Sequence, residues 1–138
     1  MKAKAVCVMR TDLRDSEGHK VNKGKLIAQG GHAFVGLICN YIYLHKEGSG
    51  LQYVESFECY GALYEWLTGS FTKIVLGVDS EEELAGIYFK AQAAGLNVVD
   101  IVDNGETVFG RPTFTCIGIG PDWEDKIDAI TGHLKGFS

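Results

Sequence analysis

Short apolar runs, separated by stretches of helical periodicity, constrain this chain most strongly. Residues 5–9 and 73–78 suit burial on both faces of a strand, which is typical of the interior of a covered sheet. Two further strands are predicted at 97–102 and 115–119. Such strands need helices on both sides, so the sequence predicts an α/β fold.

Apolar residues at steps of three or four positions predict four helices. They run from Lys23 to Leu44, over 53–67, from Ser80 to Gly95, and from Pro121 to Leu134. The third helix is marked by a capping box of Ser80 and Glu83 and by a terminal glycine. In the first, Gly30 and Gly31 weaken the helix, so a close approach of its backbone to another element or a ligand is expected.

The order of the elements predicts how the sheet is connected. The connection between 73–78 and 97–102 is long enough for a right-handed parallel crossover, whereas the one between 97–102 and 115–119 contains no helix and favours an antiparallel pair. A length of 138 residues fits one domain. We therefore expect a single three-layer α/β/α domain over 1–138, with a mixed, mainly parallel four-stranded sheet.

Composition excludes several classes of protein. The longest apolar stretches are far shorter than a membrane span, and charges at Arg10, Asp12 and Arg14 interrupt any signal-peptide core. The four cysteines are widely separated and lack zinc or redox spacing, so we interpret them as small buried apolar residues. These features predict a cytoplasmic protein without a membrane partner or a metal site.

Charge is unevenly distributed along the chain. Residues 1–25 hold seven basic and three acidic residues, a net charge of +4, while the remainder carries −9. A positive segment on an acidic body can hold phosphates at one place and discourage binding elsewhere. A solvated surface loop explains the same pattern, and charge alone does not decide between them.

Polar residues gather in two segments that follow predicted strands. One contains Arg10 and the helix start Lys23-Gly24-Lys25, and the other runs over 103–107. Both leave carboxyl ends of strands, where open α/β sheets bind ligands, so they are expected to face each other. The sequence lacks a nucleophile elbow or a phosphate-binding glycine loop, which disfavours covalent catalysis.

Several motifs occur together in one order along nearly the whole chain. They are Arg10-Thr11-Asp12-Leu13, Lys23-Gly24-Lys25 with Ala28-Gln29 and His32-Ala33, Lys73-Ile74-Val75-Leu76, Val78 to Leu84, Ala94-Gly95-Leu96, Asp103 to Thr107, Thr113 to Pro121, and Gly132 to Lys135. On these residues the chain resembles the archaeal and eukaryotic type of peptidyl-tRNA hydrolase, the type 2 family, which also occurs in some bacteria and phages.

The resemblance implies hydrolysis of the ester that joins a peptide to the 3′ ribose of tRNA, without metal or organic cofactor. It also implies a homodimer whose nucleic-acid partner is peptidyl-tRNA rather than DNA. The residues that match the family's functional group are Lys25, Asp103, Thr107 and Thr115.

Ester hydrolysis needs a positioned water, an acceptor for its proton and a donor for the oxyanion. We hypothesise that Asp103 orients the water, that Thr107 and Thr115 fix its geometry, and that Lys25 holds a phosphate or the oxyanion. Supporting substrate-binding residues are Arg10, Lys20, Lys23, Gln29, His32 and Arg111. Simpler interpretations are a turn at 103–105, a strand threonine at 115 and a solvated lysine at 25.

Two features depart from the family pattern. Glu106 stands where relatives often carry a basic residue, and it would repel a nearby phosphate. The connection between Leu13 and Lys23 is longer than usual, which fits either a tRNA contact or a tolerated insertion. Two alternatives therefore stay open, a tRNA-binding or regulatory protein that has lost turnover and a protein-interaction subunit.

Overall fold

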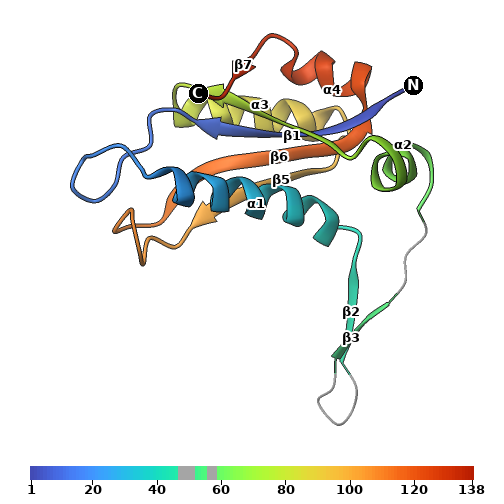
Figure 1. The fold of residues 1–138 in the computed structure, drawn as a ribbon, viewed down its shortest axis with the longest axis horizontal. Helices are drawn as coiled ribbons and strands as arrows, with labels where there is room; N and C mark the ends of the chain where they lie inside the picture. Colours follow the sequence, from blue (N-terminus) through green and yellow to red (C-terminus); the bar gives the residue numbers. More distant parts are fainter. Residues whose placement is uncertain (47–51, 56–58) are drawn as a thin grey trace.

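The computed structural model describes residues 1–46, 52–55 and 59–138, and it contains a mixed five-stranded sheet of order β5-β6-β1-β4-β7 (Figure 1). The strands are β1 (Ala3–Arg10), β4 (Thr72–Val78), β5 (Val98–Asp103), β6 (Thr113–Trp123) and β7 (Lys135–Gly136). A separate hairpin is formed by β2 (Tyr43–Lys46) and β3 (Gln52–Glu55). The helices are α1 (Lys23–Cys39), α2 (Gly61–Glu65), followed by a π-helical turn Trp66–Ser70, α3 (Glu81–Ala93) and α4 (Glu124–Thr131).

Strand β1 lies in the middle of the sheet and buries both of its faces. Val6 and Val8 pack in the cluster that contains residues of α3 and α4, whereas Cys7 and Met9 pack in the cluster with Ala33 of α1. This follows from the alternation of side chains along a strand. Figure 1 shows α1 on one side of the sheet and α3 and α4 on the other, so the predicted α/β class is confirmed.

The predicted four-stranded sheet is wrong in the number of strands. Lys135 and Gly136 add a fifth strand, β7, which pairs antiparallel with the edge of β4. Strands β1, β4 and β5 run in the same direction, as predicted, although only β1 and β4 are hydrogen-bonded parallel neighbours, while β5–β6, β6–β1 and β4–β7 are antiparallel pairs. The expected antiparallel pair of 97–102 with 115–119 is confirmed, but β5 lies at the far edge beside β6 and not beside β4.

Three predicted helices have different bounds. The first begins at Lys23 as expected but ends at Cys39, because the chain then turns into the β2–β3 hairpin. The helix expected over 53–67 is wrong in its first part, which enters β3, and residues 56–58 of it lie outside the described residues. In its second part Leu63 is buried, but Tyr60 and Tyr64, which helical periodicity would also place towards the core, are exposed. The last helix starts at Glu124, since β6 extends through Pro121 to Trp123.

The close approach of α1 to the sheet does not involve Gly30 or Gly31. A Cβ atom added at either position would meet no protein atom within 4 Å. The tightest contact is at Gly118 of β6, where a Cβ would lie 2.8 Å from the carbonyl oxygen of Ala33 and 3.0 Å from Leu37. A second one is at Gly36 of α1, where a Cβ would lie 3.2 Å from Val99 of β5, so glycines of both the strand and the helix allow α1 to lie close to the sheet.

Two expectations from composition can be compared with the structure. Among the described residues, no helix is long and apolar enough to cross a membrane. Cys7 and Cys116 are buried as expected, whereas Cys59 is half-buried and Cys39 is exposed. The expectation of buried thiols therefore fails at the end of α1.

We predict that Gly118→Ala destabilises the fold by about 1–3 kcal/mol, because the new methyl group overlaps the backbone of α1. Gly86→Ala is the matched control, since a Cβ there meets nothing within 4 Å and Gly86 lies inside α3. It should stabilise by about 0.5–1 kcal/mol. Urea unfolding monitored by circular dichroism measures both changes, and equal effects of the two substitutions would contradict the packing described here.

Candidate active site

The first turn of α1 places a lysine at the carboxyl edge of the sheet. Asn22 caps the helix, its side-chain Oδ1 accepting a hydrogen bond of 2.8 Å from the backbone N–H of Lys25. The first turn holds Lys23 and Lys25 and no acidic residue. The helix dipole does not stabilise cations at the N-terminus of a helix, so Lys23 and Lys25 need anionic partners.

The loop after β5 folds sharply around a glycine. Gly105 has φ +84°, and its N–H donates a 2.9 Å hydrogen bond to Oδ1 of Asp103. A Cβ at this glycine would lie 2.2 Å from the backbone of Arg111, which only a residue without a side chain allows. The turn thereby fixes Asp103 at the end of β5 and brings Thr107 back towards α1.

Lys25, Asp103 and Thr107 meet at this edge. The Nζ of Lys25 lies 2.8 Å from Oδ2 of Asp103 and donates a 3.0 Å hydrogen bond to Oγ1 of Thr107. The two charged side chains are 17% and 9% exposed. The start of α1 and the loop after β5 lie at the same end of the molecule (Figure 1), so the expectation that the two polar segments face each other is confirmed.

Gln29 and Thr115 lie behind this ion pair. Both side chains are fully buried. The Nε2 of Gln29 donates to Oδ2 of Asp103 at 3.0 Å, and its Oε1 accepts from the hydroxyl of Thr115 at 2.6 Å. Contrary to the expectation that Gln29 binds substrate, its amide has no surface open to one.

Opposing influences act on the carboxyl group of Asp103. Burial raises its pKa, but the hydrogen bond from Lys25, the backbone N–H of Gly105, the charge of Lys25 and the Gln29 amide together hold the pKa below its usual value. The carboxylate is therefore ionised at neutral pH. Its Oδ1 keeps acceptor capacity beyond the bond from Gly105, and the Lys25 ammonium keeps a further donor.

Three of the predicted basic residues lie together in one hollow beside the site. Arg10, Lys20 and Lys23 line one hollow of about 330 Å³, which also includes Leu26 beside Lys25. Arg10 is bound to Asp12 at 2.8 Å, and this hydrogen bond raises its pKa. The side chains of Lys20 and Lys23 make no hydrogen bond or ion pair to the part of the chain that the structure describes.

The other two predicted substrate-binding residues lie further around the rim. His32 lines a hollow of about 390 Å³ that also includes Asp103. Arg111 and Arg14 line a third of about 530 Å³, next to Phe109. Phe109, which the motifs did not single out, lies under the site with its ring centroid 5.8 Å from Nζ of Lys25. Its position two residues after Thr107 was the feature of the sequence that could have identified it.

The long connection after β1 packs against the loop that carries Thr107. The backbone N–H of Ser16 donates a 2.9 Å hydrogen bond to the carbonyl of Val108. A Cβ at Gly110 would lie 3.1 Å from the Ser16 side chain. The connection is therefore attached to the site instead of projecting away from it.

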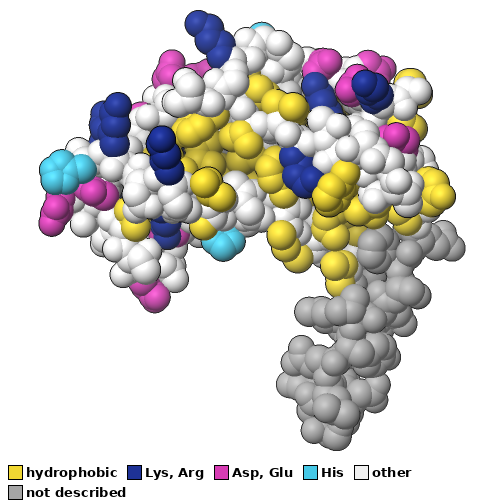
Figure 2. Space-filling view, viewed as in Figure 1, with side chains coloured by type: hydrophobic (Ala, Val, Ile, Leu, Met, Phe, Trp, Pro, Cys, Tyr) yellow, Lys and Arg dark blue, Asp and Glu magenta, His cyan; other side chains and the backbone are white. Residues whose placement is uncertain are grey.

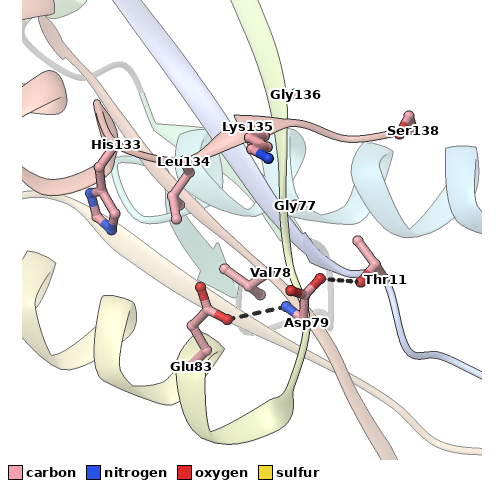
Figure 3. A pocket seen from close by; sticks show the side chains of 10 residues that line it. All are labelled: Thr11, Gly77, Val78, Asp79, Glu83, His133, Leu134, Lys135, Gly136 and Ser138. Carbon is pink, nitrogen blue, oxygen red and sulfur yellow. Dashed lines mark hydrogen bonds between the residues drawn. The ribbon is translucent and has the colours of Figure 1, made fainter.

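Two other hollows differ chemically from this site. An apolar one of about 410 Å³ lies beside α1 and includes Gly30 and Gly31. Figure 2 shows apolar side chains gathered in the middle of the face of the molecule that is in view. The other lies at the carboxyl ends of β1 and β4 (Figure 3), where Thr11 donates to Asp79 at 2.9 Å and the Asp79 N–H donates to Glu83. The second contact caps the N-terminus of α3. None of the four predicted catalytic residues lines either hollow.

A metal centre needs several ligating side chains close together. Among the described residues, no group of three or more His, Cys, Asp or Glu side chains is placed to hold a metal ion.

Comparison with known proteins gives the family. A family model described as Peptidyl-tRNA hydrolase PTH2 matches residues 3–137. This chain belongs to that family, as the motifs predicted.

Curated relatives are similar over nearly their whole length. A protein named Peptidyl-tRNA hydrolase from Methanocaldococcus jannaschii is 39% identical over 132 residues, covering 96% of this chain and 97% of the relative. One of the same name from Sulfurisphaera tokodaii is 38% identical over 135 residues, covering 98% of each.

A solved structure shares the fold alone. A protein of unknown function from Agrobacterium tumefaciens strain C58 matches with a TM-score of 0.55 and 12% identity, covering 100% of this chain and 99% of that one.

We predict that Asp103 contributes to stability in a pH-dependent way. Its folded pKa lies below the unfolded value of 3.8, so its contribution is complete above that value and is lost as the pH falls through the folded pKa. The difference in unfolding free energy between wild type and Asp103→Asn should therefore shrink as the pH falls below about 4. Urea titrations at a series of pH values measure this, and a difference that stays constant into acid would contradict it.

Proposed function

We propose that this chain hydrolyses the ester bond between the peptide and the 3′ ribose of peptidyl-tRNA, releasing the peptide and free tRNA. Membership of the family and the names of the curated relatives support this activity over a tRNA-binding protein that has lost turnover. The observation that carries it is the meeting of Lys25, Asp103 and Thr107 at one partly open edge of the sheet.

The proposed division of roles follows from the hydrogen bonds already made. Asp103 is ionised, and the acceptor capacity left on Oδ1 can orient a water towards the ester carbonyl. Thr107 accepts from Lys25, so its own O–H is left to hold that water. The remaining N–H of Lys25 stabilises the oxyanion or holds a phosphate.

The reaction balances without a covalent enzyme intermediate. The water oxygen bonds to the ester carbon, the bond from this carbon to the 3′ oxygen breaks, and the proton that the water loses balances the one that the 3′ oxygen gains. We propose that no metal or organic cofactor takes part, because an ammonium, a carboxylate and a hydroxyl supply the donor and acceptors that the reaction needs.

The proposed path of the tRNA backbone follows the basic residues around the site. Arg10, Lys20 and Lys23 share one hollow near the start of α1, and Arg111 extends the path along the loop that carries Thr107. His32 lies beside Asp103 on the exposed side of α1. Glu106 is exposed on the same loop and would keep phosphates off its own position.

The proposal also covers the compartment, the nucleic-acid partner and the oligomeric state of the enzyme. Residues 1–138 act as one domain in the cytoplasm, with tRNA and not DNA as nucleic-acid partner. The family resemblance implies a homodimer. Ile27 and Val35, 74% and 63% exposed on α1, are apolar groups that a second copy would cover.

The activity is tested with an N-blocked aminoacyl-tRNA in the presence of EDTA. Wild type should cleave the ester, and Lys25→Ala and Asp103→Ala should each lower kcat/KM by about 10²–10³-fold. Lys126→Ala and Asp125→Ala on exposed positions of α4 are matched controls and should keep wild-type rates. Tight, salt-sensitive binding of tRNA by wild type without cleavage would favour the inactive tRNA-binding alternative.

The basic path is tested by salt dependence. Replacing Lys20 and Lys23 together by alanine should weaken tRNA binding and lower the slope of log K against log salt by roughly one for each phosphate that is no longer neutralised. Filter binding over a range of potassium chloride concentrations measures the slope. If the variant and wild type have the same slope, these lysines do not contact phosphates.

A further inference from the structure

The interior of the protein contains very few polar side chains, and two of them are bonded to each other. Of the described residues, the buried polar ones are Gln29, Thr115 and Thr131. Thr131 satisfies its hydroxyl within its own helix, by donating to the carbonyl of Ile127 at 3.2 Å. Gln29 and Thr115 come from α1 and β6 and satisfy each other across the helix–sheet interface.

The direction of the hydrogen bonds between these groups is determined by their chemistry. The ionised Asp103 carboxylate only accepts, so the group of Gln29 that lies 3.0 Å from Oδ2 must be the amide N–H₂. The amide oxygen then faces Thr115 and also only accepts. The single hydroxyl proton of Thr115 is therefore donated to Gln29, at 2.6 Å.

Other acceptors for this proton are poorer. The carbonyl of Ile101 lies 3.4 Å and the sulfur of Cys116 3.7 Å from the Thr115 oxygen. A reversed amide would place two acceptor oxygens of Gln29 and Asp103 against each other. Thr115 thus specifies which way the buried amide of Gln29 points.

We propose that Gln29 and Thr115 are positioning residues for the reaction, with Thr115 orienting the Gln29 amide and this amide holding Asp103 in the orientation in which Oδ2 also binds Lys25. This inference rests on the proposed function, in which Asp103 and Lys25 act on the ester. It replaces the sequence-based hypotheses that Gln29 binds substrate and that Thr115 contacts the water.

The first test compares two threonines that undergo the same chemical change. Thr115→Val removes the donor to Gln29 and should lower kcat about tenfold with KM within about twofold of wild type, because the effect is on orientation and not on tRNA binding. Thr115→Ser keeps the donor and should recover most of the activity. Thr131→Val is the control, a buried threonine on α4 that is not bonded to any site residue, and should keep the wild-type kcat.

The second test measures the pH dependence of kcat, which a purely structural role of Gln29 would leave unchanged. In Gln29→Glu, a protonated carboxyl can still donate to Asp103, but its ionised form faces a like charge. The groups that bind the Asp103 carboxylate are Lys25 from α1, the N–H of Gly105 and this side chain. We therefore expect the kcat of this variant to fall with rising pH on a limb that wild type lacks.

A third measurement separates this inference from the proposed function. The carboxyl ¹³C shift of Asp103, followed by NMR against pH, should show a higher pKa in Gln29→Leu than in wild type, because a donor to the ionised form is removed. An inactive wild type in which this pKa still rises would refute the proposed function but support the contact. An active wild type in which Thr115→Val and Thr131→Val have equal kcat, or in which Gln29→Glu has the wild-type pH profile, would overturn the positioning role.

Discussion

The ion pair between Lys25 and Asp103 connects two segments that are far apart in the sequence, and the site depends on it. A pair this little exposed loses much of its hydration, so further hydrogen bonds have to replace part of it. The N–H of Gly105 and the amide of Gln29 donate to the Asp103 carboxylate, and the hydroxyl of Thr107 accepts from the Lys25 ammonium. Removing one charge of the pair would leave the other nearly buried without its partner.

The order of strands explains why the pair can form. Because β6 runs antiparallel between β1 and β5, the carboxyl ends of β1 and β5 lie at the same edge of the sheet. The chain leaving β1 returns as α1 across that edge, and Gly118 allows the helix to lie close enough for Gln29 to reach both Thr115 and Asp103. The packing of one helix on one strand therefore sets the geometry of the site.

The sequence predicted the parts of the fold whose side-chain pattern is local. The apolar run at β1 and the capping box of α3 were sufficient, whereas β7 has only Lys135 and Gly136 and no periodicity. Which strands become neighbours depends on where a crossover ends, which side-chain patterns do not encode. The directions of β4, β5 and β6 were therefore predicted, but the order β5-β6-β1-β4 was not.

The same distinction applies to the site. Lys25 and Asp103 were predicted because their motifs resemble a family, and because both follow strand ends. Gln29 lies four residues after Lys25 and was predicted to bind substrate, since its burial depends on Thr115 of β6 and cannot be inferred from α1 alone.

The central claim is that Lys25 and Asp103 act as one unit on the ester. The most direct measurement is the single-turnover cleavage rate of a variant that lacks both side chains, beside the two single alanine variants. If the groups act together, the double variant should cleave no more slowly than the slower single one. Losses that multiply would show that the two residues act independently and would contradict this account.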